Sequence, residues 1–255
     1  MSEEWDAVRA VLLDAGNTLV SIDFGWLVRL LAVEGVEATV DALRRAEASA
    51  RPVLSRRLAS PKAEGRLSTE SGSTFSFYVS RILAGLPGLA GEEAEALAPR
   101  LAAALKSEGN PRLWSRVLPG TRGALDALRK LGLRLAVVSN SDGTIRETLE
   151  RVDLAGPFEA IFDSRLVGFE KPDPRIFTHA LETLGCEPSS ALYVGDLYSV
   201  DVVGARAAGL EAALIDPFGD WRGVDCALVA DLPELARRLR ARSLRCQGSR
   251  VGGDP

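Results

Sequence analysis

Short apolar segments alternate with amphipathic ones along much of the chain, and this alternation is typical of an α/β protein. Residues 8–13, 133–138 and 191–194 are mostly aliphatic, and a polar or glycine residue follows each of them at once. Such short runs, apolar on both faces, predict strands buried in a parallel sheet. Residues 211–216 predict a fourth strand, and residues 226–230 predict an edge strand.

Amphipathic helices are predicted between these strands. Residues 121–132 place apolar side chains at helical spacing, and Thr121 is the expected N-cap. Residues 173–185 begin with Asp173 at the expected N-cap, followed by Pro174 in the first turn. Because strands and helices alternate, the sequence predicts a doubly wound parallel sheet with a Rossmann-like arrangement.

A long region between the first strand and the others does not follow this rhythm. Residues 21–115 are expected to form an inserted, all-helical cap domain, with residues 60–74 as a flexible loop inside it. The remaining core would comprise residues 1–20 and 116–245, and residues 246–255 are expected to be a disordered tail. Apolar positions at helical spacing occur in residues 26–35, 40–58, 75–86 and 92–105.

Composition and charge limit the kinds of molecule that the protein is expected to bind. The 255 residues include 31 basic and 35 acidic side chains, a net charge of −4 that gives no electrostatic footprint for nucleic acid or an anionic membrane. The three cysteines are far apart and lack a CxxC pair, which argues against a disulfide framework or a zinc cluster. The acidic start and the absence of an apolar run of about 20 residues predict a cytoplasmic protein. We therefore expect a small-molecule substrate and a monomer or homodimer.

Polar residues that follow three of the predicted strands are candidates for a common site. Asp14, Ser139 and Asp196 each come directly after a strand or within two residues of its end. Ligands of open parallel sheets bind outside the carboxyl ends of the strands, so these side chains are expected to converge. Asp201, five residues after Asp196, adds another carboxylate.

Four motifs follow one another along the chain: Asp14 with Thr18, Ser139 with Asn140, Lys171 before Pro172, and the GDxxxxD segment with Gly195, Asp196 and Asp201. These motifs, in this order, make the sequence resemble the haloacid dehalogenase-like hydrolase superfamily. The helical insertion also stands where the cap of that superfamily enters the core.

The resemblance implies a magnesium-dependent hydrolase of a small phosphorylated compound, which acts through an aspartyl-phosphate at Asp14. Asp14 and Lys171 would be catalytic, the first as nucleophile and the second by neutralising charge. Substrate binding is implied for Thr18, Ser139, Asn140 and Lys171. Mg²⁺ ligands are implied at Asp14, the Gly16 carbonyl, Asp196 and Asp201, the last through water or as a support for the others.

One position departs from the pattern of the resembling phosphatases. Their motif is DxDxT, and the second aspartate protonates the leaving group and then activates water, but Gly16 stands there in this chain. Positioned acid or base groups contribute about 100- to 10,000-fold to a rate, so the reaction is expected to be slow unless another group substitutes. Candidates are a cap carboxylate such as Glu64 or Glu70, a good leaving group, or solvent.

Three alternative functions remain open. A catalytically impaired member would bind a phosphorylated ligand or a protein as a regulatory module. A metal-independent haloacid dehalogenase would also lack the second aspartate, but the resembling dehalogenases carry neutral residues where this chain has Asp196 and Asp201. A phosphonate hydrolase would need a cap lysine, for which Lys62 is the early-cap candidate.

Overall fold

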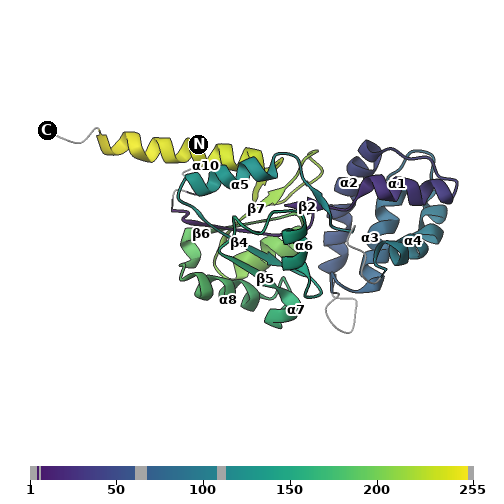
Figure 1. The fold of residues 1–255 in the computed structure, drawn as a ribbon, viewed down its shortest axis with the longest axis horizontal. Coiled ribbons are helices and arrows are strands. Elements are labelled where there is room, and N and C mark those ends of the chain that lie inside the picture. The colour runs from purple at the N-terminus through teal and green to yellow at the C-terminus, as the bar shows by residue number, and fades with distance from the viewer. Residues whose placement is uncertain (1–4, 6, 61–67, 108–112, 252–255) are drawn as a thin grey trace.

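The protein consists of an α/β part and a helical part that lie side by side (Figure 1). The computed structural model describes residues 5, 7–60, 68–107 and 113–251. Glu64 and Lys62, two of the residues considered from the sequence, lie outside the described residues.

The α/β part is built on a six-stranded sheet in the described chain, with strand order β5-β4-β1-β6-β7-β8. Every neighbouring pair in it is parallel, which confirms the predicted fold class. The central strand β1 pairs with both β4 and β6, and Leu13 at its end lies opposite Val137 and Val194. The strands are β1 (Ala10–Leu13), β4 (Arg134–Ser139), β5 (Ala160–Asp163), β6 (Ala191–Gly195), β7 (Glu211–Ile215) and β8 (Ala227–Val229).

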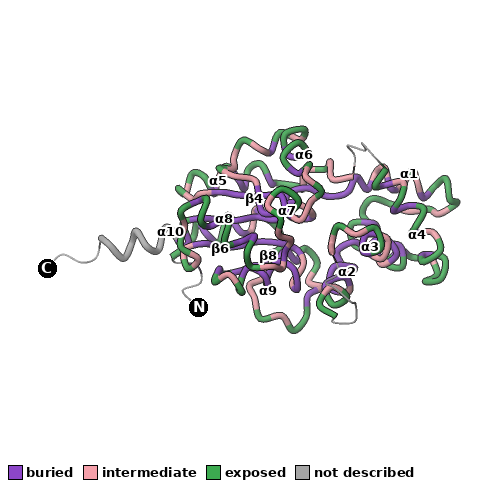
Figure 2. The backbone as a smooth tube through the Cα atoms, turned by 90° about the horizontal axis from the view of Figure 1, so that it is seen from below, coloured by how far each residue is buried: buried purple, intermediate pink, exposed green. Residues whose placement is uncertain are grey.

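Helices cover both faces of this sheet because alternate strand residues point in opposite directions. Val11 and Leu13 of β1 pack in one apolar cluster with α5 (Thr121–Lys130), α6 (Ile145–Arg151) and α10 (Leu232–Val251). Leu12 packs in another with α8 (Pro174–Leu184) and α9 (Val203–Ala207). A short helix, α7 (Ser164–Val167), follows β5, and a π-helical turn (Tyr198–Val202) precedes α9. Figure 2 shows the central strands as buried between more exposed helices.

The helical part lies between β1 and β4 in the sequence and has its own apolar core. Two short strands, β2 (Val20–Ser21) and β3 (Arg116–Val117), pair antiparallel at the point where the chain leaves and re-enters the α/β part. We call α1–α4 the helical region, and its independence as a domain of residues 21–115 stays a prediction. Its helices are α1 (Phe24–Val33), α2 (Val40–Leu58), α3 (Gly72–Ala84) and α4 (Gly91–Leu105).

Some element boundaries differ from the sequence predictions. The N-cap of α5 is Gly120 rather than Thr121, because the chain enters the helix through a left-handed residue with φ of 76°. The α3 helix begins at Gly72, inside the loop expected over 60–74, because the Ser71 hydroxyl accepts a hydrogen bond from the Thr74 amide and caps it.

The sequence predicted only one of the two edge strands of the six-stranded sheet. The edge strand β8 matches the prediction for residues 226–230, whereas β5 at the opposite edge was missed. The helix α10 continues to Val251, through most of the segment expected to be a disordered tail. None of the described helices is long and apolar enough to cross a membrane.

Close packing around Gly204 of α9 supports the loop that carries Lys171. A Cβ atom at Gly204 would lie 2.7 Å from Cε2 of Phe177 and 2.8 Å from Cα of Pro172. We predict that Gly204→Ala lowers the free energy of unfolding by about 1–3 kcal/mol, because the added methyl overpacks this contact. Urea unfolding measures the change. Gly123→Ala is the matched control, since nothing lies within 4 Å of its Cβ position, and equal stabilities of the two variants would contradict the prediction.

Candidate active site

A buried lysine joins two carboxylates at the carboxyl ends of the central strands. Lys171 Nζ donates hydrogen bonds to Oδ1 of Asp14 at 2.7 Å, to Oδ1 of Asp201 at 2.8 Å and to the Tyr193 hydroxyl at 2.8 Å. All four residues are buried. Asp14 directly follows β1, and its amide donates to the Val194 carbonyl of the neighbouring strand β6. The sheet therefore brings together motifs that are distant in the sequence.

Burial and charge act against each other within this group. Burial raises the pKa of Asp14 to about 6, and the nearby Lys171 ammonium limits that rise. Burial alone would lower the pKa of Lys171, but the carboxylates of Asp14 and Asp201 outweigh it and hold the pKa above its usual value. Lys171 is therefore charged at neutral pH and stabilises negative charge beside Asp14.

Asp201 is held mainly by the protein itself. Its Oδ2 accepts hydrogen bonds from the backbone amides of Asp196 at 3.1 Å and Leu197 at 2.9 Å, while Oδ1 faces Lys171. A Cβ atom at Gly195 would lie 2.3 Å from Cγ of Asp201, so only glycine permits this approach. The glycine and the second aspartate of GDxxxxD thus fix the loop that presents Asp196.

The described residues include one group of carboxylates that could hold a metal ion. One oxygen each from Asp14, Asp196 and Asp201 lies within 4.8 Å of the others. Burial also raises the pKa of Asp196, and Arg51 opposes this rise. A buried, oxygen-rich group of this kind fits a hard divalent cation. Since both oxygens of Asp201 already have protein partners, Asp14 and Asp196 are the better placed of the three.

A buried polar group connects the helical region to Asp196. Asn17 Nδ2 donates to Oδ2 of Asp196 and to the Tyr78 hydroxyl, both at 3.0 Å. The Tyr78 hydroxyl in turn donates to Oε1 of Glu47. Arg51 donates to both oxygens of Glu47 at 2.7 and 2.6 Å, and its Nε lies 3.6 Å from Oδ2 of Asp196. We call these five residues the Arg51 cluster.

Sequence reasoning missed this cluster. The helical spacing over residues 40–58 did not show which face of the helix is buried, and the Arg51 side chain is only 6% exposed. The available signal was the spacing of Glu47 and Arg51, since residues four apart on a helix form ion pairs. Nothing in the sequence indicated that α2 turns this pair toward the sheet.

Ser139 and Asn140 lie near Asp14, as the sequence predicted, and both line the same cavity. The Asn140 side chain, however, binds the backbone of the lysine loop. Its Oδ1 accepts from the Lys171 amide at 2.8 Å, and its Nδ2 donates to the Lys171 carbonyl at 3.0 Å. Asn140 therefore positions Lys171 through its side chain.

Thr18 is not brought into this cavity. Its buried hydroxyl has no hydrogen-bond partner among the described residues and lines a second cavity, of about 160 Å³. Asn17 and Arg51 also line this cavity, and each has one buried polar atom, Oδ1 and Nη1, without a described partner. The left-handed turn at Asn17, with φ of 52°, precedes Thr18 at this point.

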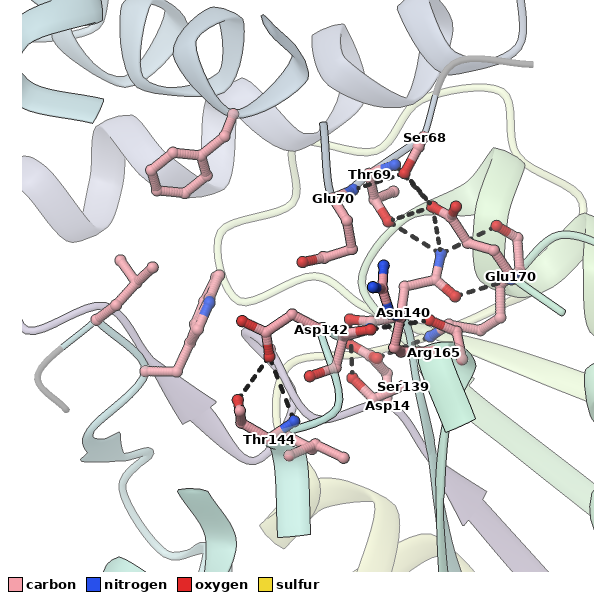
Figure 3. Close-up of a pocket in the computed structure, with 18 of the residues that line it drawn as sticks. Asp14, Ser68, Thr69, Glu70, Ser139, Asn140, Asp142, Thr144, Arg165 and Glu170 are labelled. Atoms are coloured by element: carbon pink, nitrogen blue, oxygen red, sulfur yellow. Dashed lines mark hydrogen bonds and ion pairs between the residues drawn. The ribbon is translucent and has the colours of Figure 1, made fainter. Parts of the chain in front are cut away.

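The main cavity, of about 1010 Å³, lies between the sheet end and the helical region. Figure 3 shows Asp14, Ser139 and Asn140 on its core side and Glu70 entering from the helical side. This volume is at the upper end of the range for small-molecule sites, about 300–1,000 Å³. Gly16 lines the cavity beside Asp14, and the Trp114 ring packs against it, 3.4 Å from the position of a Cβ atom.

Comparisons with known proteins agree with this architecture. Residues 8–209 match the model of a family described as haloacid dehalogenase-like hydrolase. The chain is 41% identical over 123 residues to haloacid dehalogenase-like hydrolase domain-containing protein 3 of Bos taurus, which is 48% of this chain and 49% of that protein. It is 35% identical over 134 residues to the glyceraldehyde 3-phosphate phosphatase of Methanothermobacter thermautotrophicus, which is 49% of this chain and 59% of that protein.

A crystal structure gives a longer match. The HAD phosphatase from Thermococcus onnurineus is 27% identical, with a TM-score of 0.55, over 91% of this chain and 98% of that one. The matched segment of this chain spans only about half the length of each of the two curated relatives above.

The buried lysine leads to a first prediction for the site. Lys171→Met is expected to lower the free energy of unfolding by about 3–5 kcal/mol at neutral pH, because Asp14 and Asp201 lose their buried counter-charge. Chemical denaturation followed by tryptophan fluorescence measures the loss. Lys130→Met, at an exposed lysine of α5, is the control, and a loss no larger than in this control would contradict the prediction.

The Arg51 cluster leads to a second prediction. Arg51→Met leaves the Glu47 carboxylate buried without its charge partner, so we expect a loss of about 3–5 kcal/mol in the free energy of unfolding. The double variant Glu47→Met with Arg51→Met removes both charges and is expected to be more stable than the single variant. Urea denaturation compares the three proteins. A double variant less stable than Arg51→Met would show that burial of the charge does not determine the loss.

Proposed function

Since the chain belongs to the haloacid dehalogenase-like hydrolase family, we propose that it hydrolyses a small phosphorylated compound with Asp14 as the nucleophile. The observation that carries the proposal is the buried group in which Lys171 joins Asp14 and Asp201 beside the main cavity. A carboxylate next to a fixed cation can approach a phosphate dianion that would otherwise repel it. The relatives named as phosphatases support phosphorus as the target.

The reaction would proceed in two displacements. An oxygen of Asp14 attacks phosphorus, and the alcohol of the substrate leaves, so that an aspartyl-phosphate forms. Water then attacks phosphorus and restores the Asp14 carboxylate. Lys171 would balance the negative charge in both steps, while the Ser139 hydroxyl and the Asn140 amide would bind phosphoryl oxygens. Asn140 also holds the Lys171 backbone in place through its side chain.

The acidic group supports a magnesium requirement. Asp14 and Asp196 would hold Mg²⁺ together with the Gly16 carbonyl, and Asp201 would support them through its bonds to Lys171 and the 196–197 amides. When bound, the ion supplies positive charge that screens the carboxylate from the phosphate. Asn17 fixes the orientation of Asp196 by donating to its Oδ2.

The helical region would act as the cap of this site. Thr74, Phe75 and Tyr78 of α3 line the main cavity opposite the sheet end. Their position supports exclusion of water from the reacting phosphate and selection of the substrate. The Arg51 cluster would hold α2 and α3 against Asp196 while the cavity is closed.

A regulatory binding protein is the second candidate, and Gly16 is the observation that favours it. Without an acid at this position, the chain would bind a phosphorylated ligand and turn it over slowly or not at all. Dehalogenation at carbon is less well supported, because the buried carboxylates of Asp196 and Asp201 are retained.

Phosphate release from a panel of phosphorylated metabolites tests the proposal. We expect release by the wild type with magnesium, loss with a chelator, and a decrease of at least 1,000-fold in Asp14→Asn, on the order of what nucleophile removal costs in other hydrolases. Folding of the variant is checked by its unfolding midpoint. Activity that persists in Asp14→Asn would exclude this nucleophile, and halide release from 2-haloacids without metal would indicate chemistry at carbon.

A further inference from the structure

The proposed reaction needs a proton donor, and the usual position cannot supply one. Gly16 has no side chain, and the Trp114 ring lies 3.4 Å from the position that a Cβ atom would take. A longer side chain there would be directed at this ring. A donor supplied by the protein would therefore come from another wall of the main cavity.

Most carboxylates of this cavity already have other partners. Asp14, Asp196 and Asp201 form the acidic group described above. Oε1 of Glu170 accepts hydrogen bonds from the Ser68 and Thr69 hydroxyls and the Thr69 amide. Asp142 accepts from the hydroxyl and amide of Thr144. Two further glutamates line the described cavity, Glu70 and Glu147.

Glu70 reaches the cavity from the helical region. It lies two residues before the start of α3, and its side chain extends toward the space occupied by Asn140 and Asp142 (Figure 3). The side chain is 38% exposed, so water and substrate can reach it. Its charged neighbour is Lys106, whose Nζ lies 3.9 Å from Oε2 and donates to the Glu70 carbonyl at 3.1 Å. Glu147 instead lines the cavity from α6, on the side of the α/β part.

The surroundings of Glu70 suit an exchangeable proton. Partial removal from water raises the pKa of Glu70 to about 7. The Lys106 ammonium opposes this rise, and the carboxylates of Asp142, Glu170 and Asp163 add to it. A group with a pKa near the working pH can both give and take a proton.

We propose that Glu70 is the general acid and base of this enzyme, in place of the aspartate that Gly16 lacks. In the first step, an Asp14 oxygen bonds to phosphorus, the bond from phosphorus to the leaving oxygen breaks, and that oxygen takes the proton of Glu70. In the second step, water bonds to phosphorus and gives its proton to Glu70, and the bond from phosphorus to Asp14 breaks. The inference rests on the proposed phosphatase function.

Leaving groups of different basicity test the first step. In Glu70→Gln, kcat/KM for a simple alkyl phosphate is expected to fall by about 100- to 10,000-fold, because an alkoxide leaves poorly without a proton. For p-nitrophenyl phosphate, whose phenolate leaves unprotonated, the fall is expected to be less than about 10-fold. In the wild type, kcat/KM for the alkyl phosphate should decrease as pH rises through about 7, and Glu70→Gln should lose this decrease.

Rapid mixing tests the second step. With p-nitrophenyl phosphate, Glu70→Gln should release one equivalent of p-nitrophenol per site in a burst and then turn over slowly, because phosphorylated Asp14 awaits an activated water. Glu147→Gln is the matched control, since it removes the same charge from the same cavity. It should retain the wild-type ratio of kcat/KM between the two substrates and show no such burst.

The outcomes separate the two proposals. If the wild type is active through Asp14 but Glu70→Gln retains full activity, or loses the same factor with both substrates and shows no burst, the role of Glu70 is overturned and the phosphatase function stands. If the wild type releases no phosphate from either substrate, the proposed function falls, and the role of Glu70 falls with it.

Discussion

The site depends on the two ion pairs that the buried ammonium of Lys171 forms with Asp14 and Asp201. Two carboxylates this close to each other in a buried setting would repel and take up protons unless a cation lay between them. Lys171 is itself held by Asn140, which bonds both its amide and its carbonyl. The geometry of Asp14 thus depends on residues that follow β1 and β4, on the loop that carries Lys171 and on the π-helical turn that carries Asp201.

This arrangement follows from the topology of the sheet. The strand β1 lies between β4 and β6, and all three run in the same direction, so the residues after their ends share one edge. Gly195 then allows Asp201 to return to this edge within half a dozen residues. A fold with a different strand order would need much longer loops to bring the same four motifs together.

The sequence predicted the strands whose residues are mostly aliphatic, and it predicted the motif residues that follow them. It missed β5, because Ala160–Asp163 is a short edge strand that is only partly buried. It also missed the Arg51 cluster, because a pair of charges four residues apart looks the same on a buried helix face as on a solvated one. The spacing of Asp14 and Thr18 also could not show that the two residues line separate cavities. Contacts between the helical region and the sheet depend on docking, which local patterns do not encode.

The position of the helical region against the sheet also bears on the missing proton donor at Gly16. Trp114 lies two residues before β3, at the junction of the helical region and the α/β part, and its ring covers Gly16. A proton donor at position 16 of the α/β part would lie beside Asp14 whether or not the helical region covered the cavity. In the proposed reaction, a donor at Glu70 would reach the phosphate only when α3 lies over the sheet end. A donor on the helical side of the cavity would therefore make closure a condition of the proposed proton transfer. Asn17, which donates to both Tyr78 of α3 and Asp196, would link that closure to the acidic group.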